Sequence, residues 1–173
     1  TEGKYSLPAR FQLVAAMNPC KCGYYPDRSR CHCLPGEVNR YLRKISRPLL
    51  DRIDICMETP KVEYRDISTT AENESSAAIR ERVEAARRIQ KKRYEHCTWQ
   101  YNSHLKAAAL REFCREQRIM ELAFERMNLS ARGYHRIIKV ARTIADLEGE
   151  ENIREPHLLE AIGYRSADQK IWE

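Results

Sequence analysis

Residues 129–149 read LSARGYHRIIKVARTIADLEG, and this stretch decides how the second half of the chain folds. Ser130 can act as an N-cap, because its hydroxyl can accept a hydrogen bond from a free N–H of the first helical turn. Gly149 is suited to end the helix. We therefore predict a helix over residues 130–148. Its apolar side chains recur every three or four residues, as one buried face requires, and they are Ile137, Val140, Ala141, Ile144 and Leu147.

The same helix carries a basic face. At about 100° per residue, Arg132, Arg136 and Lys139 fall together, roughly opposite the apolar side chains. Arg132 lies near the helix N-terminus, where the helix dipole also favours an anion. A solvated basic stripe is the ordinary interpretation of such a face, and a phosphate site is the alternative.

The remaining sequence after Ser75 is also helical in pattern. The first helix of this region has a heavily basic outer face, with seven Lys or Arg and three Glu between Ile79 and His96. We predict an all-helical bundle. Its further helices are expected at residues 75–95, 104–115, 117–127 and 155–164.

The first 60 residues have a different pattern. Residues 11–17 form an apolar run that is typical of a strand buried on both faces, and residues 53–57 alternate between apolar and polar side chains like a strand. A helix is expected between them, from Pro35 to about Ser46. We predict an α+β chain: the end of a parallel α/β core over 1–60, a linker over 61–74 and the helical domain over 75–173.

Four cysteines gather in a loop rich in glycine, proline and tyrosine. Cys20, Cys22, Cys31 and Cys33 form two Cys-x-Cys pairs separated by eight residues. Four thiolates can close a tetrahedral Zn²⁺ site, which would be structural because no position stays open for a substrate. Reduced surface cysteines, or disulfides formed on purification, are the alternative, and His32 is a substitute ligand.

Two side chains near the predicted strands are candidates for phosphate chemistry. Asn18 follows the first strand, at the edge where open parallel sheets bind ligands, and its amide can bind a γ-phosphate or an attacking water. A simple Asn-Pro turn is the alternative. Arg52 precedes the second strand and can reach a neighbouring subunit. Its alternative is a local ion pair with Asp51 or Asp54.

Composition limits the function. The 173 residues carry a net charge of +6, which is compatible with nucleic acid, ATP phosphates or an acidic protein surface as partner. The sequence has no apolar stretch of about 20 residues and no signal-peptide pattern, so we expect no membrane insertion and a cytoplasmic location. It also contains no Gly-x-x-x-x-Gly-Lys-Ser/Thr motif, so the chain alone is expected to be inactive as an ATPase.

Four ordered stretches together resemble the magnesium-chelatase-like AAA+ ATPases of the ComM/YifB type, and the resemblance covers nearly the whole chain. They are FQLVAAMNPCKCG at 11–23, YLRKISRPLLDRIDI at 41–55, ESSAAIRERVEAARRIQ at 74–90 and LSARGYHRIIKVARTIADLEG at 129–149.

The resemblance implies roles for the candidate residues. Asn18 matches the sensor 1 residue that orients the attacking water, and Arg52 matches the arginine finger that acts on the neighbouring subunit. Arg47 is a second candidate for the finger. Arg132 matches sensor 2. Arg136, which shares its basic helical face, is a further candidate nucleotide-binding residue from the spacing alone. The helical domain corresponds to the lid.

The resemblance also implies partners and cofactors. It points to a hexameric ring that uses ATP and Mg²⁺ and acts on DNA in branch migration or transformation, with the Walker A and B motifs outside this sequence. From the residues alone, a non-enzymatic zinc-containing DNA-binding module or a protein-interaction module stays open as the alternative.

Overall fold

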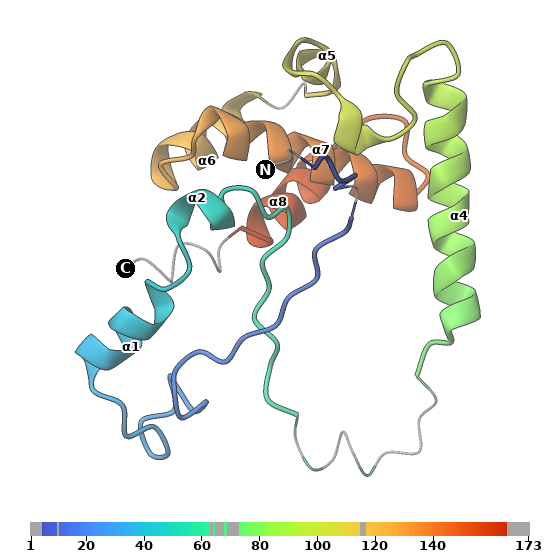
Figure 1. Cartoon of the computed structure of the whole chain (residues 1–173). Helices are drawn as coiled ribbons and strands as arrows, with labels where there is room; N and C mark the ends of the chain where they lie inside the picture. Colours follow the sequence, from blue (N-terminus) through green and yellow to red (C-terminus); the bar gives the residue numbers. More distant parts are fainter. Residues whose placement is uncertain are drawn as a thin grey trace. The chain divides into compact units, whose positions relative to one another are not determined.

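The computed structural model describes residues 5–9, 11–62, 64, 68, 73–114 and 117–165, and the chain divides into two compact units (Figure 1). Unit 1 is Thr1–Lys44 and contains helix α1 (Pro35–Leu42). Unit 2 is Ile45–Glu173. Its helices are α2 (Arg47–Leu50), α4 (Ser76–Arg93), the 3₁₀ helix η1 (Asn102–His104), α5 (Ala107–Phe113), α6 (Gln117–Arg126), α7 (Ala131–Leu147) and α8 (Glu155–Gly163).

Helix α7 is the element around which unit 2 is built. It packs against α4, η1, α5 and α8 (Figure 1). Its ends confirm the prediction: the Ser130 hydroxyl accepts a 3.0 Å hydrogen bond from the Gly133 N–H, and Gly149 adopts the left-handed backbone with φ of 75°. The predicted helices of the bundle are confirmed as well, each within a few residues of its expected bounds.

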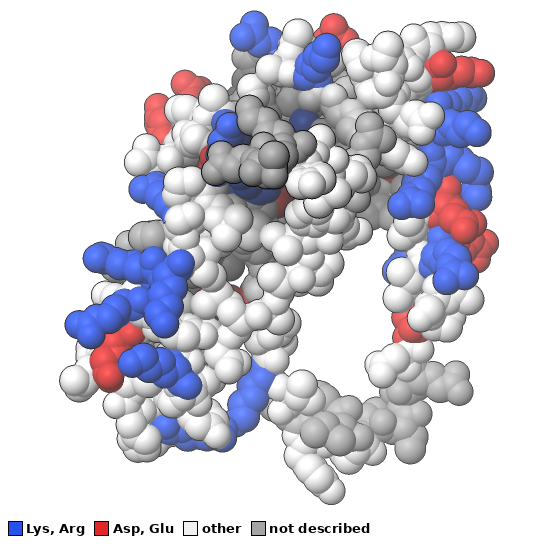
Figure 2. Space-filling model, in the orientation of Figure 1, with Lys and Arg blue, Asp and Glu red and all other residues white. Residues whose placement is uncertain are grey.

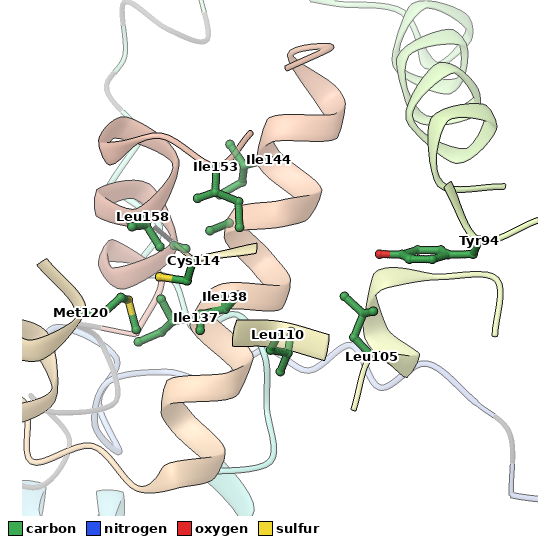
Figure 3. Close-up of a cluster of buried hydrophobic side chains, with 12 residues drawn as sticks. Tyr94, Leu105, Leu110, Cys114, Met120, Ile137, Ile138, Ile144, Ile153 and Leu158 are labelled. Carbon is green, nitrogen blue, oxygen red and sulfur yellow. The ribbon is translucent and has the colours of Figure 1, made fainter. Parts of the chain in front are cut away.

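The hydrophobic core of unit 2 surrounds the middle of α7. Ile137 and Ile138 are fully buried there, and side chains from the flanking helices close around them (Figure 3). Each such side chain contributes about 1.5–3 kcal/mol through its removal from water. The main contributions from the other elements are Leu105, Leu110, Cys114, Met120, Ile153 and Leu158.

A buried polar network lies beside this core, and its centre is the Asp146 carboxylate. Arg93 of α4 donates to both of its oxygens at 2.5 and 3.0 Å. Arg142, fully buried, donates to it at 3.2 Å, and the Asn102 amide donates at 2.8 Å. The Asp146 side chain thereby connects α4, η1 and α7, and its donors are two guanidinium groups and one amide.

The network continues to the backbone beyond the end of α7. Arg142 donates to the carbonyl oxygens of Glu150 at 2.6 Å and Glu151 at 2.7 Å. The Tyr94 hydroxyl donates to the Asn102 side chain at 2.7 Å. Buried polar groups are tolerated only when they are paired, so this arrangement fixes one register of α4 against α7.

The two strands predicted near the start of the chain are wrong, and the α+β class is correct only for its helical part. No β-strand occurs among the described residues. Phe11 and Val14 are 77% and 84% exposed, and Met57 is 67% exposed. A strand persists only when a neighbouring strand pairs with it through a ladder of backbone hydrogen bonds, and no described segment forms such a ladder with either run. The Cys56 N–H bonds instead to the Tyr164 carbonyl, at 2.8 Å.

Among the described residues, no helix combines the length and apolarity that crossing a membrane requires. The expected domain division, with a linker over 61–74, stays a prediction, since most of those positions lie outside the described residues.

We expect Asp146→Ala to lower the free energy of unfolding by about 3–5 kcal/mol, because it leaves two guanidinium groups without their buried partner. Urea unfolding followed by circular dichroism measures this. Glu81→Ala removes a carboxylate from the exposed face of α4 and is the control, with an expected change below about 0.5 kcal/mol. An Asp146 variant as stable as this control would show that the network does not hold the bundle.

Candidate functional site

The four cysteines of the predicted metal centre come together in unit 1. Their Sγ atoms all lie within 4.8 Å of one another, and the Sγ of Cys22 is 3.3 Å from that of Cys20 and 3.6 Å from that of Cys31. The Cys20 and Cys31 side chains are buried, and Cys33 is partly buried. All four are free thiols.

Tight turns place the two Cys-x-Cys pairs opposite each other. The Gly23 N–H donates to the Cys20 carbonyl at 3.1 Å, and Gly23 has a φ of 82°, which side-chain-bearing residues rarely adopt. Between the pairs, Asp27 closes a second turn: its carboxylate accepts from the Ser29 hydroxyl, and its carbonyl accepts from the Cys31 N–H at 2.7 Å. The loop is therefore shaped by its own backbone.

The thiols are electrostatically unequal. Burial raises the pKa of Cys20, but the Tyr25 backbone and the thiols of Cys22 and Cys31 together lower it to about 6. Burial raises the pKa of Cys31 to about 11. Four thiols this close cannot all ionise without a cation among them, because each thiolate repels the next. A divalent metal supplies that charge, so the four sulfur ligands fit a structural metal ion.

Asn18 lies beside this loop. Its side-chain carbon Cγ is 3.8 Å from the point where a Cβ on Gly23 would stand. Asn18 is exposed. Unit 1 therefore contains the predicted metal ligands and the predicted sensor 1 residue, while Arg52, Arg132 and Arg136 lie in unit 2.

A cavity of about 850 Å³ opens along the basic face of α7 in unit 2. Arg132 and Arg136, both predicted to bind nucleotide, line it together. His135 and Lys139 of the same helix also line it, and the other walls include residues of α5 and α8 and the segment around Ile55. The basic side chains predicted to share one helical face thus line one hollow. The prediction that they lie roughly opposite the apolar face is wrong, because Val140, Ile144 and Leu147 of α7 line the same cavity.

Carboxylates from the segment after α2 meet the cations of this face. Arg132 lies 3.7 Å from the Asp51 carboxylate, and Arg136 forms a close hydrogen bond with Asp54. The Lys139 ammonium donates to the Ser103 carbonyl at 2.7 Å. Burial lowers the pKa of Lys139, and the nearby Arg136 charge lowers it further against the opposing effect of Asp54.

Asp51 also binds the N-terminus of α7. It accepts a 2.9 Å hydrogen bond from the Ser130 hydroxyl, the same group that caps the helix, and it lies 3.9 Å from Arg165. Arg165 is buried and donates to the Ile53 carbonyl at 3.0 Å. A carboxylate is favoured at this helix end by the dipole. The Asp51 carboxylate therefore occupies the anion-favouring end of α7.

Arg52 does not form the local ion pair that was its alternative interpretation. Its guanidinium donates to the Pro48 carbonyl at 2.7 Å, and the side chain is exposed. Asp51 and Asp54 bind the α7 cations instead. Within the described residues Arg52 has no carboxylate partner, so its charge faces solvent.

Sequence reasoning missed the roles of Asp51 and Asp54 and the contribution of Arg165. The two carboxylates were considered only as neighbours of Arg52. The sequence did contain an indication of these roles. Arg132 and Arg136 lie four residues apart on one helix face, and two like charges on a partly covered face are stabilised by acidic side chains from another segment.

Two family models match this chain. One describes the magnesium chelatase subunit ChlI and matches residues 1–67, and the other describes the C-terminal part of that subunit and matches residues 73–165.

Curated relatives match along nearly the whole sequence. Competence protein ComM of Haemophilus influenzae is 41% identical over 168 residues, which are 94% of this chain and 32% of that protein. The uncharacterized protein YifB of Escherichia coli is 40% identical over 176 residues, 99% of this chain and 34% of that protein. The uncharacterized protein Rv2897c of Mycobacterium tuberculosis is 34% identical over 168 residues, which are 95% of this chain and 33% of that protein. The chain spans about a third of the length of these relatives.

We expect the chain to bind one zinc ion and Cys20→Ser to lose it, because one of the four sulfur ligands, a buried one, is then removed. Elemental analysis after extensive dialysis measures the bound metal. Cys97→Ser is the matched control, since Cys97 is an exposed thiol outside the cluster. Zinc retained by the Cys20 variant at the wild-type level, or lost equally by the Cys97 variant, would contradict the site.

Proposed function

Because the chain belongs to the magnesium chelatase subunit ChlI family, we propose that it is the sensor, arginine-finger and lid part of a ring-forming AAA+ ATPase that acts on DNA. The sequence has no phosphate-binding Walker A loop. The proposal therefore gives this chain one side of an ATP site, and the phosphate-cradling loop lies in sequence that these 173 residues do not include.

The observation that supports the proposal most is the position of Arg132. This side chain is 57% exposed, lines the cavity on α7 and lies within the first turn of the helix. Its 3.7 Å separation from Asp51 makes a weak ion pair that a phosphate group can displace. A helix N-terminus with a guanidinium beside it is a suitable place for a terminal phosphate.

The other proposed residues have separate tasks. Arg136 lines the same cavity one turn further along and adds positive charge to the nucleotide site. Arg52 has an exposed guanidinium bound to a backbone carbonyl, so it can move to a site on a neighbouring subunit. Arg47 stays the second candidate for this role. Asn18 has an exposed amide that can orient the attacking water.

Bound ATP with Mg²⁺ supplies the phosphoryl group and neutralises part of its charge. The contribution of this chain is positioning and electrostatic stabilisation. Arg132 holds the terminal phosphate from the lid, Arg52 of the adjacent subunit stabilises charge that develops during transfer, and Asn18 holds the water. No side chain of this set forms a covalent bond with the substrate.

We assign the metal centre a structural role as a zinc site. The cysteine loop has little apolar core of its own, so metal binding contributes much of the free energy that folds it. With four protein sulfur ligands the ion has no open position, and hydrolysis is assigned to the cations of unit 2 and to Asn18.

DNA and a hexameric ring are the proposed partners. ComM is named a competence protein, which fits a protein that handles DNA. In this chain, support comes from the charge of +6 and from the exposed basic side chains of α4, a helix whose visible surface in Figure 2 is mostly basic with acidic groups between the cations. They are Arg80, Arg87, Arg88, Lys91 and Lys92.

A non-enzymatic zinc-containing DNA-binding or protein-interaction module is the second candidate. The cysteine cluster and the α4 surface favour it, because both are complete within this chain. It gives no role to the cavity lined by Arg132 and Arg136, so the two candidates differ in whether these arginines affect ATP.

We expect Arg132→Ala to weaken ATP binding by about 10- to 100-fold in the full-length protein, because a charge-assisted contact with phosphate is lost. Titration with a fluorescent ATP analogue measures the affinity. Arg126→Ala removes an exposed cation at the end of α6 and is the control. Equal affinities of the two variants would favour the non-enzymatic module.

We expect Arg52→Ala to reduce ATP turnover by at least about a hundredfold with little effect on ATP binding, because a finger acts on charge that develops during transfer. Asn18→Ala is expected to be inactive as well. An equal mixture of the two variants should regain turnover, since some rings then place an intact Arg52 beside a subunit with an intact Asn18. No recovery in mixed rings would contradict a finger that acts between subunits.

The 173-residue chain alone is expected to show no ATP turnover, with or without added zinc, because it has no Walker A loop. Release of inorganic phosphate from ATP measures this directly. ATP turnover by the purified chain that disappears in Arg132→Ala would contradict the proposal that the phosphate-binding loop lies outside these 173 residues.

A further inference from the structure

The outer side of the cysteine loop carries two arginine side chains stacked on tyrosine rings. The Arg30 guanidinium carbon lies 4.1 Å from the centre of the Tyr24 ring, and that of Arg28 lies 5.2 Å from the centre of the Tyr25 ring. Tyr24 is 44% exposed. Both pairs are cation–π contacts in which a flat ring and a flat cation are presented at the surface together.

Helix α1, in the same unit, adds further cations. Arg40 and Arg43 line a shallow hollow of about 380 Å³ with Gly36 and Asn39. Lys and Arg side chains gather over this helix in Figure 2. The hollow and the stacked pairs therefore offer two kinds of contact within one small unit: point charges on a helix, and planar groups on a loop.

The acidic groups of this unit neutralise only part of the charge. The Glu37 carboxylate lies 3.9 Å from the Lys21 ammonium, and the pKa of Asp27 is lowered by its hydrogen bond from Ser29 and, more weakly, by the charge of Arg30. Residues 11–44 contain six Lys or Arg and two acidic residues. The Asp27 carboxylate accepts from the Ser29 N–H and hydroxyl at 3.0 and 2.6 Å, and the Glu37 carboxylate accepts from the Leu34 N–H at 3.0 Å. The cations of this stretch stay in excess even beside a zinc ion with four thiolates, which together carry a charge of about −2.

We propose that one surface of unit 1 binds single-stranded nucleic acid. This surface, called the loop surface below, is formed by Tyr24, Tyr25, Arg28 and Arg30 of the cysteine loop and by Arg40 and Arg43 of α1. The inference rests on the proposed DNA partner and adds where and in what form the strand binds. The stacked Arg–Tyr pairs receive unpaired bases, and the α1 arginines bind the phosphates of the same strand.

The planar groups favour a single strand over the other anionic partners. Bases of a duplex are already stacked on each other and cannot lie on a surface ring without being unpaired. An acidic peptide would use the charges and leave the rings without a role. The α4 surface differs in this respect, because its exposed basic residues have no aromatic side chain among them and suit the phosphates of either form.

The test is the affinity of the chain for a fluorescently labelled oligothymidylate and for a duplex of the same length, measured by anisotropy at one fixed salt concentration. We expect Tyr24→Ala and Arg30→Ala each to weaken binding of the single strand by about tenfold and to affect the duplex much less. Tyr24→Phe keeps the ring and is expected to bind like the wild type. Tyr101→Ala, which removes an exposed ring from unit 2, is the matched control.

A second variant shows whether weaker binding could result from unfolding of the cysteine loop. Arg40→Ala with Arg43→Ala leaves the loop side chains in place and is also expected to weaken single-strand binding, with a shallower salt dependence because phosphate contacts are lost. Zinc content is measured for every variant, so that loss of the metal is not mistaken for loss of a contact.

Unchanged single-strand affinity in Tyr24→Ala and in the α1 double variant would overturn the proposal, and so would an equal loss for strand and duplex. If these variants bind DNA normally while Arg87→Ala on α4 does not, the proposal of a DNA partner is supported and the proposal of the loop surface is wrong. If the wild-type chain binds neither form, the loop surface and the DNA partner fail together, whereas the ATP site is judged separately by Arg132→Ala.

Discussion

The Asp146 carboxylate is the constraint on which unit 2 depends. It binds the guanidinium groups of Arg93 and Arg142 and the amide of Asn102, and of these only Arg93 is partly exposed. Separating α4 or η1 from α7 would leave a charge buried without its partner, which costs more than most single apolar contacts contribute. The apolar core supplies most of the stabilisation, and this network selects one arrangement of the helices from those that would bury a similar area.

Because the network fixes the rotation of α7, it also fixes the direction in which the basic face of this helix points. Arg132 and Arg136 then line the cavity, and the carboxylates of Asp51 and Asp54 come to meet them from the segment after α2. The segment that carries Arg52 is thereby attached to the helix that carries Arg132. Under the proposed function, a phosphate that displaces Asp51 from Arg132 would loosen this attachment and so couple nucleotide binding to the position of Arg52.

The sequence predicted the helices of unit 2 well, because caps and apolar spacing act locally, as at Ser130 and Gly149. The cysteine spacing likewise predicted a cluster that the structure confirms. The strands at 11–17 and 53–57 were wrong because an apolar pattern cannot say whether a partner strand is present. The burial of Arg142 and Asp146 was missed because helical periodicity treats charged residues as exposed, and only long-range pairing with Arg93 reveals the reason. The roles of Asn18, Arg52 and Arg132 stay predictions.

An experimental structure of the full-length protein with a non-hydrolysable ATP analogue and Mg²⁺ tests the account most directly. The position of the Arg132 guanidinium is the decisive observation. The account predicts that it leaves Asp51 and binds an oxygen of the terminal phosphate while the contacts of Asp146 stay intact. An Arg132 side chain still paired with Asp51, with the nucleotide bound away from the basic face of α7, would contradict it.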